Sequence, residues 1–339
     1  MPAGSLATAE HLSRLVAAYL LRRLLQIAVV VVLVTTAAFV LIHLAPGDPF
    51  SGAIANPNVS GAVRAHWREA YGLDKPLPQQ FGSYIASVAR GDLGWSFSLQ
   101  RPVIDVLRDA VPNTLLLMSI AIAASFALGI AIALAQVTRA GSATDRIIGG
   151  VSLFFFSLPE FWLALMALGL LAYRFPLFPI GGMVDPVTHQ SLSLFARGLD
   201  IARHLVLPAL TLTLVFSAVV ARYQRAALLD VMPAEYIRTA RAKGLSERAI
   251  IRRHALRNAL LPIVTLLGLA VPALLTGAIF VEKIFSWPGM GLVIVNSIDT
   301  RDYPLLISSV IAGSVLVAFG SLIADILYRV CDPRLRDAT

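Results

Sequence analysis

The sequence contains a single cysteine, Cys331, among its 339 residues. One cysteine excludes a disulfide within the chain and any zinc site that needs two or more thiolates. The six histidines show neither the H-E-x-x-H spacing nor a close cluster with other metal-ligating side chains. We therefore expect no metal site.

Motifs of catalysis and nucleotide binding are also missing. The sequence has no G-x-S-x-G, the turn that carries the nucleophilic serine of many hydrolases. It has no G-x-x-x-x-G-K-[ST], the loop that binds nucleotide phosphates, and Lys243-Gly244 stands in the reversed order. We expect a chain that is not an enzyme, hydrolyses no nucleotide and has no cofactor of its own.

Charged residues are scarce. They make up 14% of the sequence, against 57% hydrophobic residues, and the mean hydropathy is +0.76. A soluble domain has about a quarter charged residues, so this composition predicts a polytopic membrane protein. The net charge of +8 would suggest nucleic acid in a soluble chain, but in a membrane protein basic residues collect on one side. We expect no nucleic-acid partner.

What the sequence does have is long apolar runs. A helix that crosses the hydrocarbon of a bilayer needs about 20 residues. The first run follows Arg22 and Arg23 and is too long for a signal peptide, so it is expected to be a retained anchor. The fold class expected is all-α, with six transmembrane helices at about 24–44, 113–138, 147–172, 205–221, 258–282 and 304–328.

The basic residues predict the orientation of these helices. Of the 28 lysines and arginines, 17 fall on the side that holds both termini and 11 on the other side. The denser side is expected to be cytoplasmic, in a bacterial-type inner membrane. The resulting segments are a cytoplasmic N-terminal segment (1–23), a first helix (24–44), an external loop forming a cap of short helices (45–112), a five-helix core (113–328) with a cytoplasmic loop (228–257), and a cytoplasmic tail (329–339).

The most charged stretch runs from Glu235 to Pro262. From Arg222, shortly before this stretch, to Arg257 the sequence carries nine basic and three acidic residues. Such a segment cannot lie in hydrocarbon, because each Arg or Lys costs about 2.5–3.5 kcal/mol at a helix centre. The pattern predicts two short helices. Pro233 is expected to open the first at its first position, with Tyr236, Ile237 and Ala240 on one face, Gly244 ending it and Ser246 capping the second. Such an ordered surface suits a protein partner, and the alternative is a solvated basic loop that binds anionic membrane lipid.

Few ionisable residues fall inside the predicted helices. Glu160, beside Pro159, belongs either to a helix break or to a transport path, because charges within a membrane are costly and are kept for function. One carboxylate is a thin basis for ion coupling. The fifth helix carries Gly268, Pro272 and Gly277, which either loosen a path-lining helix or allow close helix packing.

The charged stretch resembles the coupling loop of permease subunits of ABC importers, in the branch that carries peptides and nickel. Residues 235–244 read E-Y-I-R-T-A-R-A-K-G, with Arg238 where the general family has the glutamate of its E-A-A motif. Leu261-Pro262 stand for the closing pair, after a longer gap than in the sugar and amino-acid branches. Further similarities occur in the same order at A-P-G-D-P (45–49), G-D-L-G (91–94), S-L-P (157–159), V-E (281–282) with F-S-W-P-G (285–289), R-D-Y-P (301–304) and D-P-R (332–334).

This resemblance implies an ABC type I importer permease that works by alternating access. It implies a homologous second permease subunit, two ATP-binding cassette subunits that bind ATP and Mg²⁺, and an extracytoplasmic substrate-binding protein. The cargo it implies is a dipeptide or oligopeptide, with nickel or another solute as the alternative. The residues it implies at the ATPase contact are Glu235, Tyr236, Arg238, Thr239, Ala240, Arg241, Gly244 and Leu245.

Two other functions remain open from the residues alone. One is an ion-coupled carrier or channel, which would transport without ATPase partners. The other is a membrane anchor or assembly factor, which would bind lipid through the basic loop and bring down no ATPase.

Overall fold

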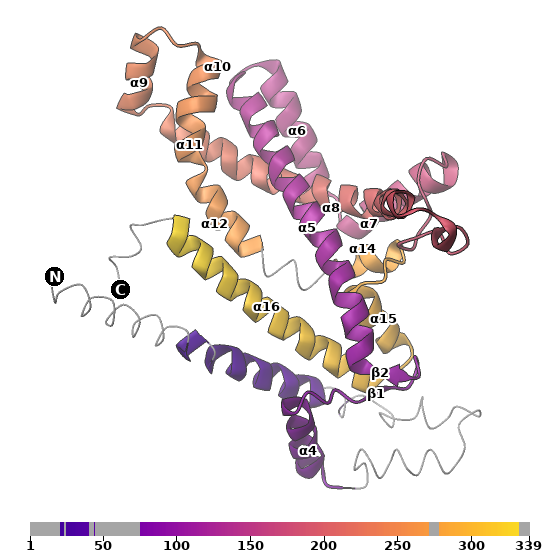
Figure 1. Ribbon diagram of the computed structural model, residues 1–339. Helices are drawn as coiled ribbons and strands as arrows, with labels where there is room; N and C mark the ends of the chain where they lie inside the picture. Colours follow the sequence, from indigo (N-terminus) through magenta and orange to yellow (C-terminus); the bar gives the residue numbers. More distant parts are fainter. Residues whose placement is uncertain (1–20, 24, 41–43, 45–74, 271–277, 332–339) are drawn as a thin grey trace, which may run out of the picture. The chain divides into compact units, whose positions relative to one another are not determined.

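The structure is a computed structural model that describes residues 21–23, 25–40, 44, 75–270 and 278–331, with side chains up to Leu322. The described chain is predominantly helical (Figure 1). It forms two compact units, one of Met1–Leu107 with Asn296–Leu322 and the other of Arg108–Val295 with Ile323–Thr339. The all-α prediction is confirmed for these residues, apart from one small hairpin.

The first unit contains an apolar N-terminal helix, a surface helix, the hairpin and most of the last long helix. Its elements are Leu21–Val40, α4 (Leu77–Ala89), β1 (Trp95–Ser96), β2 (Arg101–Pro102) and most of α16 (Tyr303–Cys331). The hairpin is antiparallel and pairs Trp95 with Pro102. Sequence patterns did not predict it, because two-residue strands show no alternation of polar and apolar residues.

Packing in the first unit centres on α16. Ile307 and Ile311 are buried against apolar residues of α4 and of the N-terminal helix, and the rings of Phe39 and Phe81 meet at 5.3 Å between centroids. The predicted turn at 91–94 is confirmed, since Gly91 and Gly94 both have a φ of +80°. The preceding part of the external loop, with A-P-G-D-P at 45–49, lies outside the described residues.

The second unit carries two long helices and the charged stretch. Its elements are most of α5 (Val103–Val137), α6 (Ala143–Ser157), α7 (Glu160–Ala167), a π-helical turn (Leu168–Arg174), a short 3₁₀ turn (His189–Ser191), α8 (Leu194–Val231), α9 (Glu235–Ala242), α10 (Glu247–Ile250), a second π-helical turn (Ile251–Ala255), α11 (Leu256–Ala259), α12 (Leu261–Ala270), α14 (Ile279–Ile284) and the first part of α15 (Met290–Asp299).

Four helices in the described chain are long and apolar enough to cross a membrane, or five if a bent pair counts as one span. They correspond to five of the six predicted helices. The fifth predicted helix, 258–282, is divided among α11, α12 and α14, and residues 271–277 lie outside the described residues. The count of six therefore stays a prediction. With 35 and 38 residues, α5 and α8 are roughly 50–57 Å long, well beyond the 30 Å of hydrocarbon.

The third predicted span is broken. α6 ends at Ser157, α7 begins at Glu160, and the two axes differ by 99°. The cause is local, because Pro159 has no N–H to donate and its ring disfavours helical backbone in the residue before it. Leu158 is accordingly extended, with a ψ of 133°. The helix therefore breaks beside Pro159, and Glu160 is the first residue after the break.

The core of the second unit lies between α5, α7 and α8. Leu117 of α5, Ala164 of α7 and Leu212 of α8 are each 0% exposed. Trp287, which follows α14, closes the same cluster and is also 0% exposed. This contact fixes the segment that follows α14 against α5, although the two are far apart in the sequence.

Candidate functional site

The charged stretch forms two helical segments joined by a tight turn, which we call the elbow (residues 235–259). Figure 1 shows α9 turning back beside α10. Gly244 has a φ of +78°, and its N–H donates to the carbonyl oxygen of Arg241 at 2.9 Å. Left-handed backbone of this kind favours glycine, so the predicted role of Gly244 as the end of the first helix is confirmed.

The second helical segment begins at its predicted cap. The Ser246 hydroxyl accepts a hydrogen bond from the Ala249 N–H at 3.4 Å. From Glu247 to Ala259 the segment runs through α10, the π-helical turn and α11. Pro233 does not open the first helix as predicted. α9 begins at Glu235 with Ala234 as its cap residue, because the turn that ends α8 occupies residues 232–233.

One ion pair joins the two segments. The Arg241 guanidinium donates to both carboxylate oxygens of Glu247, at 2.6 and 3.2 Å. The hydrogen bond from Arg241 lowers the pKa of Glu247 below its ordinary value. Both side chains are largely exposed, at 43% and 57%, so the pair orders the turn more than it stabilises the fold.

The elbow is fixed to the ends of the long helices by a small apolar core. Ile237 of α9 and Ile250 of α10 are 0% exposed, and they pack with Val137 of α5 and Leu228 of α8. A movement of the elbow is therefore transmitted to α5 and α8, because a packed apolar core moves as one body rather than deforming continuously.

The eight predicted contact residues divide between this core and the surface. Ala240 is buried at 5% exposure, so it fixes the helix rather than presenting a contact. Tyr236 is 39% exposed, which makes the buried face narrower than predicted and leaves Ile237 and Ala240 to form it. The residues on the surface are Glu235, Tyr236, Arg238, Thr239, Arg241, Gly244 and Leu245.

The predicted path residues are only partly described. Glu160 is the first residue of α7 and is half-buried beside the bend. The next residue, Phe161, places its ring 6.2 Å from that of Phe280 in α14. Gly268 is buried in α12. Pro272 and Gly277 lie outside the described residues.

Sequence patterns did not reveal the role of Glu282. This side chain is 0% exposed and accepts hydrogen bonds from the Thr114 hydroxyl at 2.8 Å and the Gly291 N–H at 2.6 Å. Beside it, the Trp287 indole N–H donates to the Asn113 carbonyl oxygen at 2.9 Å. We call Asn113, Thr114, Glu282, Trp287 and Gly291 the Glu282 cage. The V-E motif was visible in the sequence, but the partner that joins Glu282 to α5, Thr114, lies 168 residues away.

A second carboxylate has the same kind of role in the first unit. Asp302 is 1% exposed and accepts hydrogen bonds from the Ser96 hydroxyl at 2.6 Å and the Ser98 N–H at 2.8 Å. Its other oxygen accepts from the Leu305 N–H and caps α16. This contact fixes the small hairpin to the last long helix.

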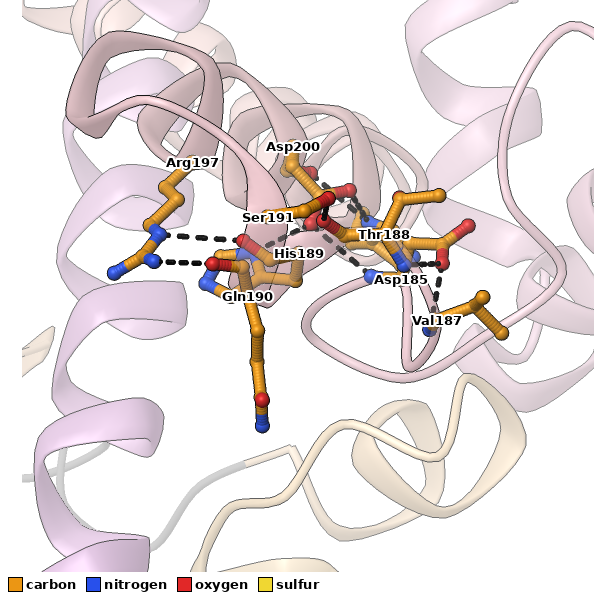
Figure 2. A network of polar contacts seen from close by, with 9 residues as sticks. Asp185, Val187, Thr188, His189, Gln190, Ser191, Arg197 and Asp200 are labelled. Carbon is orange, nitrogen blue, oxygen red and sulfur yellow. Dashed lines mark hydrogen bonds and ion pairs between the residues drawn. The ribbon is translucent and has the colours of Figure 1, made fainter.

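A third polar network organises the loop before α8, shown in Figure 2. The Asp200 carboxylate contacts the Nδ1 atoms of His189 at 2.6 Å and of His204 at 3.2 Å. Arg197 donates to the carbonyl oxygens of His189 and Gln190. Asp185 accepts from the N–H groups of Thr188 and Val187, and these bonds lower the pKa of its carboxyl group. The loop is thus tied to the first turns of α8.

Comparison with known proteins identifies a family over most of the chain. The family described as "Binding-protein-dependent transport system inner membrane component" matches residues 125–337. The N-terminal part of such membrane components matches residues 16–118. Both units of the structure are therefore covered.

Named relatives match nearly end to end. The oligopeptide transport system permease protein AppB of Bacillus subtilis is 37% identical over 320 residues, which cover 94% of this chain and 99% of that protein. The dipeptide transport system permease protein DppB of Escherichia coli is 35% identical over 333 residues, covering 94% and 98%. The glutathione transport system permease protein GsiC of Salmonella typhi is 36% identical over 319 residues, covering 94% and 98%.

Proposed function

This chain belongs to the family of binding-protein-dependent transport system inner membrane components, and we propose that it is the permease subunit of an ATP-driven importer of short peptides. It is a multi-pass inner-membrane transport subunit of the ABC type I class rather than an enzyme. The mechanism proposed is alternating access, in which two states of the helix bundle open the path to opposite sides in turn.

The observation that carries the proposal is the construction of the elbow. Its surface residues, among them Arg238 and Tyr236, are presented by a helix whose other face is locked into the core of α5 and α8. A loop needed only for its charge has no reason to be built this way. A partner that grips α9 can move the long helices, and its differential affinity for the two bundle states supplies the drive.

The drive comes from subunits outside this chain. The sequence has no phosphate-binding G-x-x-x-x-G-K-[ST] loop, so ATP and Mg²⁺ are assigned to two ATP-binding cassette subunits that contact the elbow. The path is formed together with a homologous second permease, and an extracytoplasmic binding protein delivers the cargo. In this chain the path residues proposed are Glu160, Gly268, Pro272 and Gly277.

The cargo proposed is a di- or oligopeptide. The three relatives compared are named for oligopeptide, dipeptide and glutathione transport, and all three cargoes are short chains of amide-linked amino acids. The orientation proposed places the elbow and both termini in the cytoplasm, because the elbow side holds 17 of the 28 lysines and arginines.

Substitutions within the elbow test the proposal. Ala240→Trp forces a large side chain into the core beneath α9, and Gly244→Pro cannot adopt the left-handed backbone. In either variant we expect loss of ATPase co-purification and of ATP-dependent peptide uptake, while the chain still inserts into the membrane. Leu194→Trp places the same bulk at an 86% exposed position away from the elbow, and should leave ATPase association unchanged. Undiminished ATP-dependent uptake in Ala240→Trp or Gly244→Pro would contradict the proposal.

A further inference from the structure

A cleft of about 1220 Å³ opens between α6 and α8, on the side of the second unit that carries the elbow. Arg146 of α6 and Arg222 and Arg225 of α8 line it, with Asp145 and Asp230 as its acidic residues. Its remaining wall is largely apolar and includes Leu153, Phe156, Val219 and Leu229. The cleft therefore combines a basic part and an apolar part.

One of the three arginines has a partner within the cleft. Arg225 donates to Asp145 at 3.0 Å, and Asp145 also accepts from the Gly141 N–H at 3.1 Å. These contacts fix α6 and the turn before it to α8, so the helices on the two sides of the cleft are connected. The Nε of Arg225 is buried and makes no hydrogen bond within the described chain.

The other two arginines are unpaired. Among the described residues, the guanidinium groups of Arg146 and Arg222 make no hydrogen bond and no ion pair. With Asp145 engaged by Arg225, the cleft keeps two free guanidinium groups against the single carboxylate of Asp230. A guanidinium presents a planar set of donors that matches the oxygens of a phosphate group.

The position of the two free arginines along their helices indicates the source of that phosphate. Arg146 directly precedes the predicted span 147–172, and Arg222 directly follows the predicted span 205–221. Both guanidinium groups therefore belong at the depth of the lipid headgroups. Leu153 and Val219 stand one to two turns further into their spans, where acyl chains run, and Leu153 is 59% exposed.

We propose that this cleft is a binding site for an anionic phospholipid, with the headgroup phosphate between Arg146 and Arg222 and an acyl chain against Leu153 and Phe156. Basic pockets between transmembrane helices bind anionic headgroups in this manner. The site does not depend on what the transporter carries. It places a lipid against the α6–α8 contact, directly beside the core that fixes the elbow.

The test compares lipid binding by two double variants of the full-length purified chain. Native mass spectrometry measures retention of phosphatidylglycerol and of phosphatidylcholine with identical acyl chains. Arg146→Gln with Arg222→Gln should weaken phosphatidylglycerol binding about tenfold, since hydrogen bonds to two charged groups are lost. Arg252→Gln with Arg253→Gln removes the same charge from exposed positions of the elbow and should leave binding unchanged. Arg146→Lys with Arg222→Lys should restore part of it.

Three results would overturn the site. Equal loss of phosphatidylglycerol binding in both glutamine double variants would show diffuse attraction to surface charge. Complete displacement of phosphatidylglycerol by millimolar inorganic phosphate would show a site for free anions rather than lipid. In the assembled transporter, a photo-crosslinking residue at Leu153 that reacts with the second permease instead of with lipid would show that a protein segment fills the cleft.

Discussion

The elbow and the Glu282 cage use charge and glycine in opposite ways. In the elbow the charged side chains of Arg238, Arg241 and Glu247 lie on the surface, whereas the cage surrounds one carboxylate that is 0% exposed. Gly244 has open space around it, so only its backbone angle demands glycine. At Gly291 a Cβ would lie 2.7 Å from the Cα of Ile279, so glycine is required there because a side chain would clash with the backbone of Ile279.

This difference separates a surface for a partner from a joint within the chain. The buried carboxylate of Glu282 accepts hydrogen bonds from the N–H groups of Gly291 and Leu292, in the first turn of α15, and from the Thr114 hydroxyl of α5. Removal of this carboxylate should therefore lower the stability of the fold. The elbow has its polar groups on the surface, so substitutions there should weaken binding of the partner subunit more than they destabilise the fold.

The largest effect on stability is expected from Glu282→Ala. It leaves the Thr114 hydroxyl and the Gly291 N–H buried without an acceptor, at a cost of about 3–5 kcal/mol. Thermal unfolding of the detergent-purified chain measures it. Glu235→Ala, which removes an exposed carboxylate from α9, is the matched control and should leave the melting temperature nearly unchanged. Equal melting temperatures for the two variants would contradict the claim that the Glu282 cage stabilises the fold and the exposed charges of the elbow do not.

The two glycines give the next largest contrast. Gly291→Ala must displace backbone and is expected to cost about 2–3 kcal/mol by overpacking. Gly244→Ala is expected to cost about 1 kcal/mol, because alanine disfavours the left-handed backbone at this position. The melting temperature of Gly291→Ala should therefore be lower than that of Gly244→Ala. The amount of ATPase that co-purifies should fall more in Gly244→Ala. The reverse ranking in either measurement would mean that the two regions have been assigned the wrong roles.

A smaller effect is expected at the ion pair between Asp145 and Arg225. Asp145→Asn keeps the shape of the side chain but removes its charge, and should cost about 1–2 kcal/mol. Because this pair connects the α5–α6 turn to α8, the loss should be the same in the isolated chain and in the assembled transporter. A loss seen only in the assembled transporter would place Asp145 at a subunit contact instead.

The smallest effect is expected at the ion pair of the elbow. Glu247→Gln should change the unfolding free energy by no more than about 1 kcal/mol, because both partners are exposed. The lowered pKa of Glu247 sets the direction of its pH dependence. The contribution of the pair is full above the ordinary glutamate pKa of about 4.3 and is lost as the pH falls below it. The difference in melting temperature between wild type and Glu247→Gln should thus be constant from pH 7 to about pH 5.

Local signals predicted the elbow from sequence. Gly244 and Ser246 act within a few residues of themselves, and the nine basic residues placed the segment outside the hydrocarbon, so the turn and the second cap were found. The predicted start of α9 at Pro233 was wrong, because Pro233 belongs to the turn that follows α8. The bend between α6 and α7 was only half anticipated, since Pro159 identifies a break but no local pattern gives its 99° angle.

Long-range polar contacts could not be predicted in the same way. Glu282 and Thr114 are 168 residues apart, Asp302 and Ser96 are 206 apart, and Arg225 and Asp145 are 80 apart. Helical periodicity carries information over a few turns only, so it identifies each residue as polar in an apolar setting and says nothing about its partner.

The most direct test asks which subunit touches the exposed face of α9. Tyr236 on the elbow and Tyr173 in the π-helical turn after α7 are both exposed tyrosines, at 39% and 81%. Each is replaced in turn by a photo-crosslinking phenylalanine analogue in the assembled transporter, and the products are identified by mass spectrometry. We expect Tyr236 to give an adduct with an ATP-binding cassette subunit and Tyr173 to give none. No ATPase adduct at Tyr236, or one at Tyr173, would contradict the assignment of the elbow as the coupling surface.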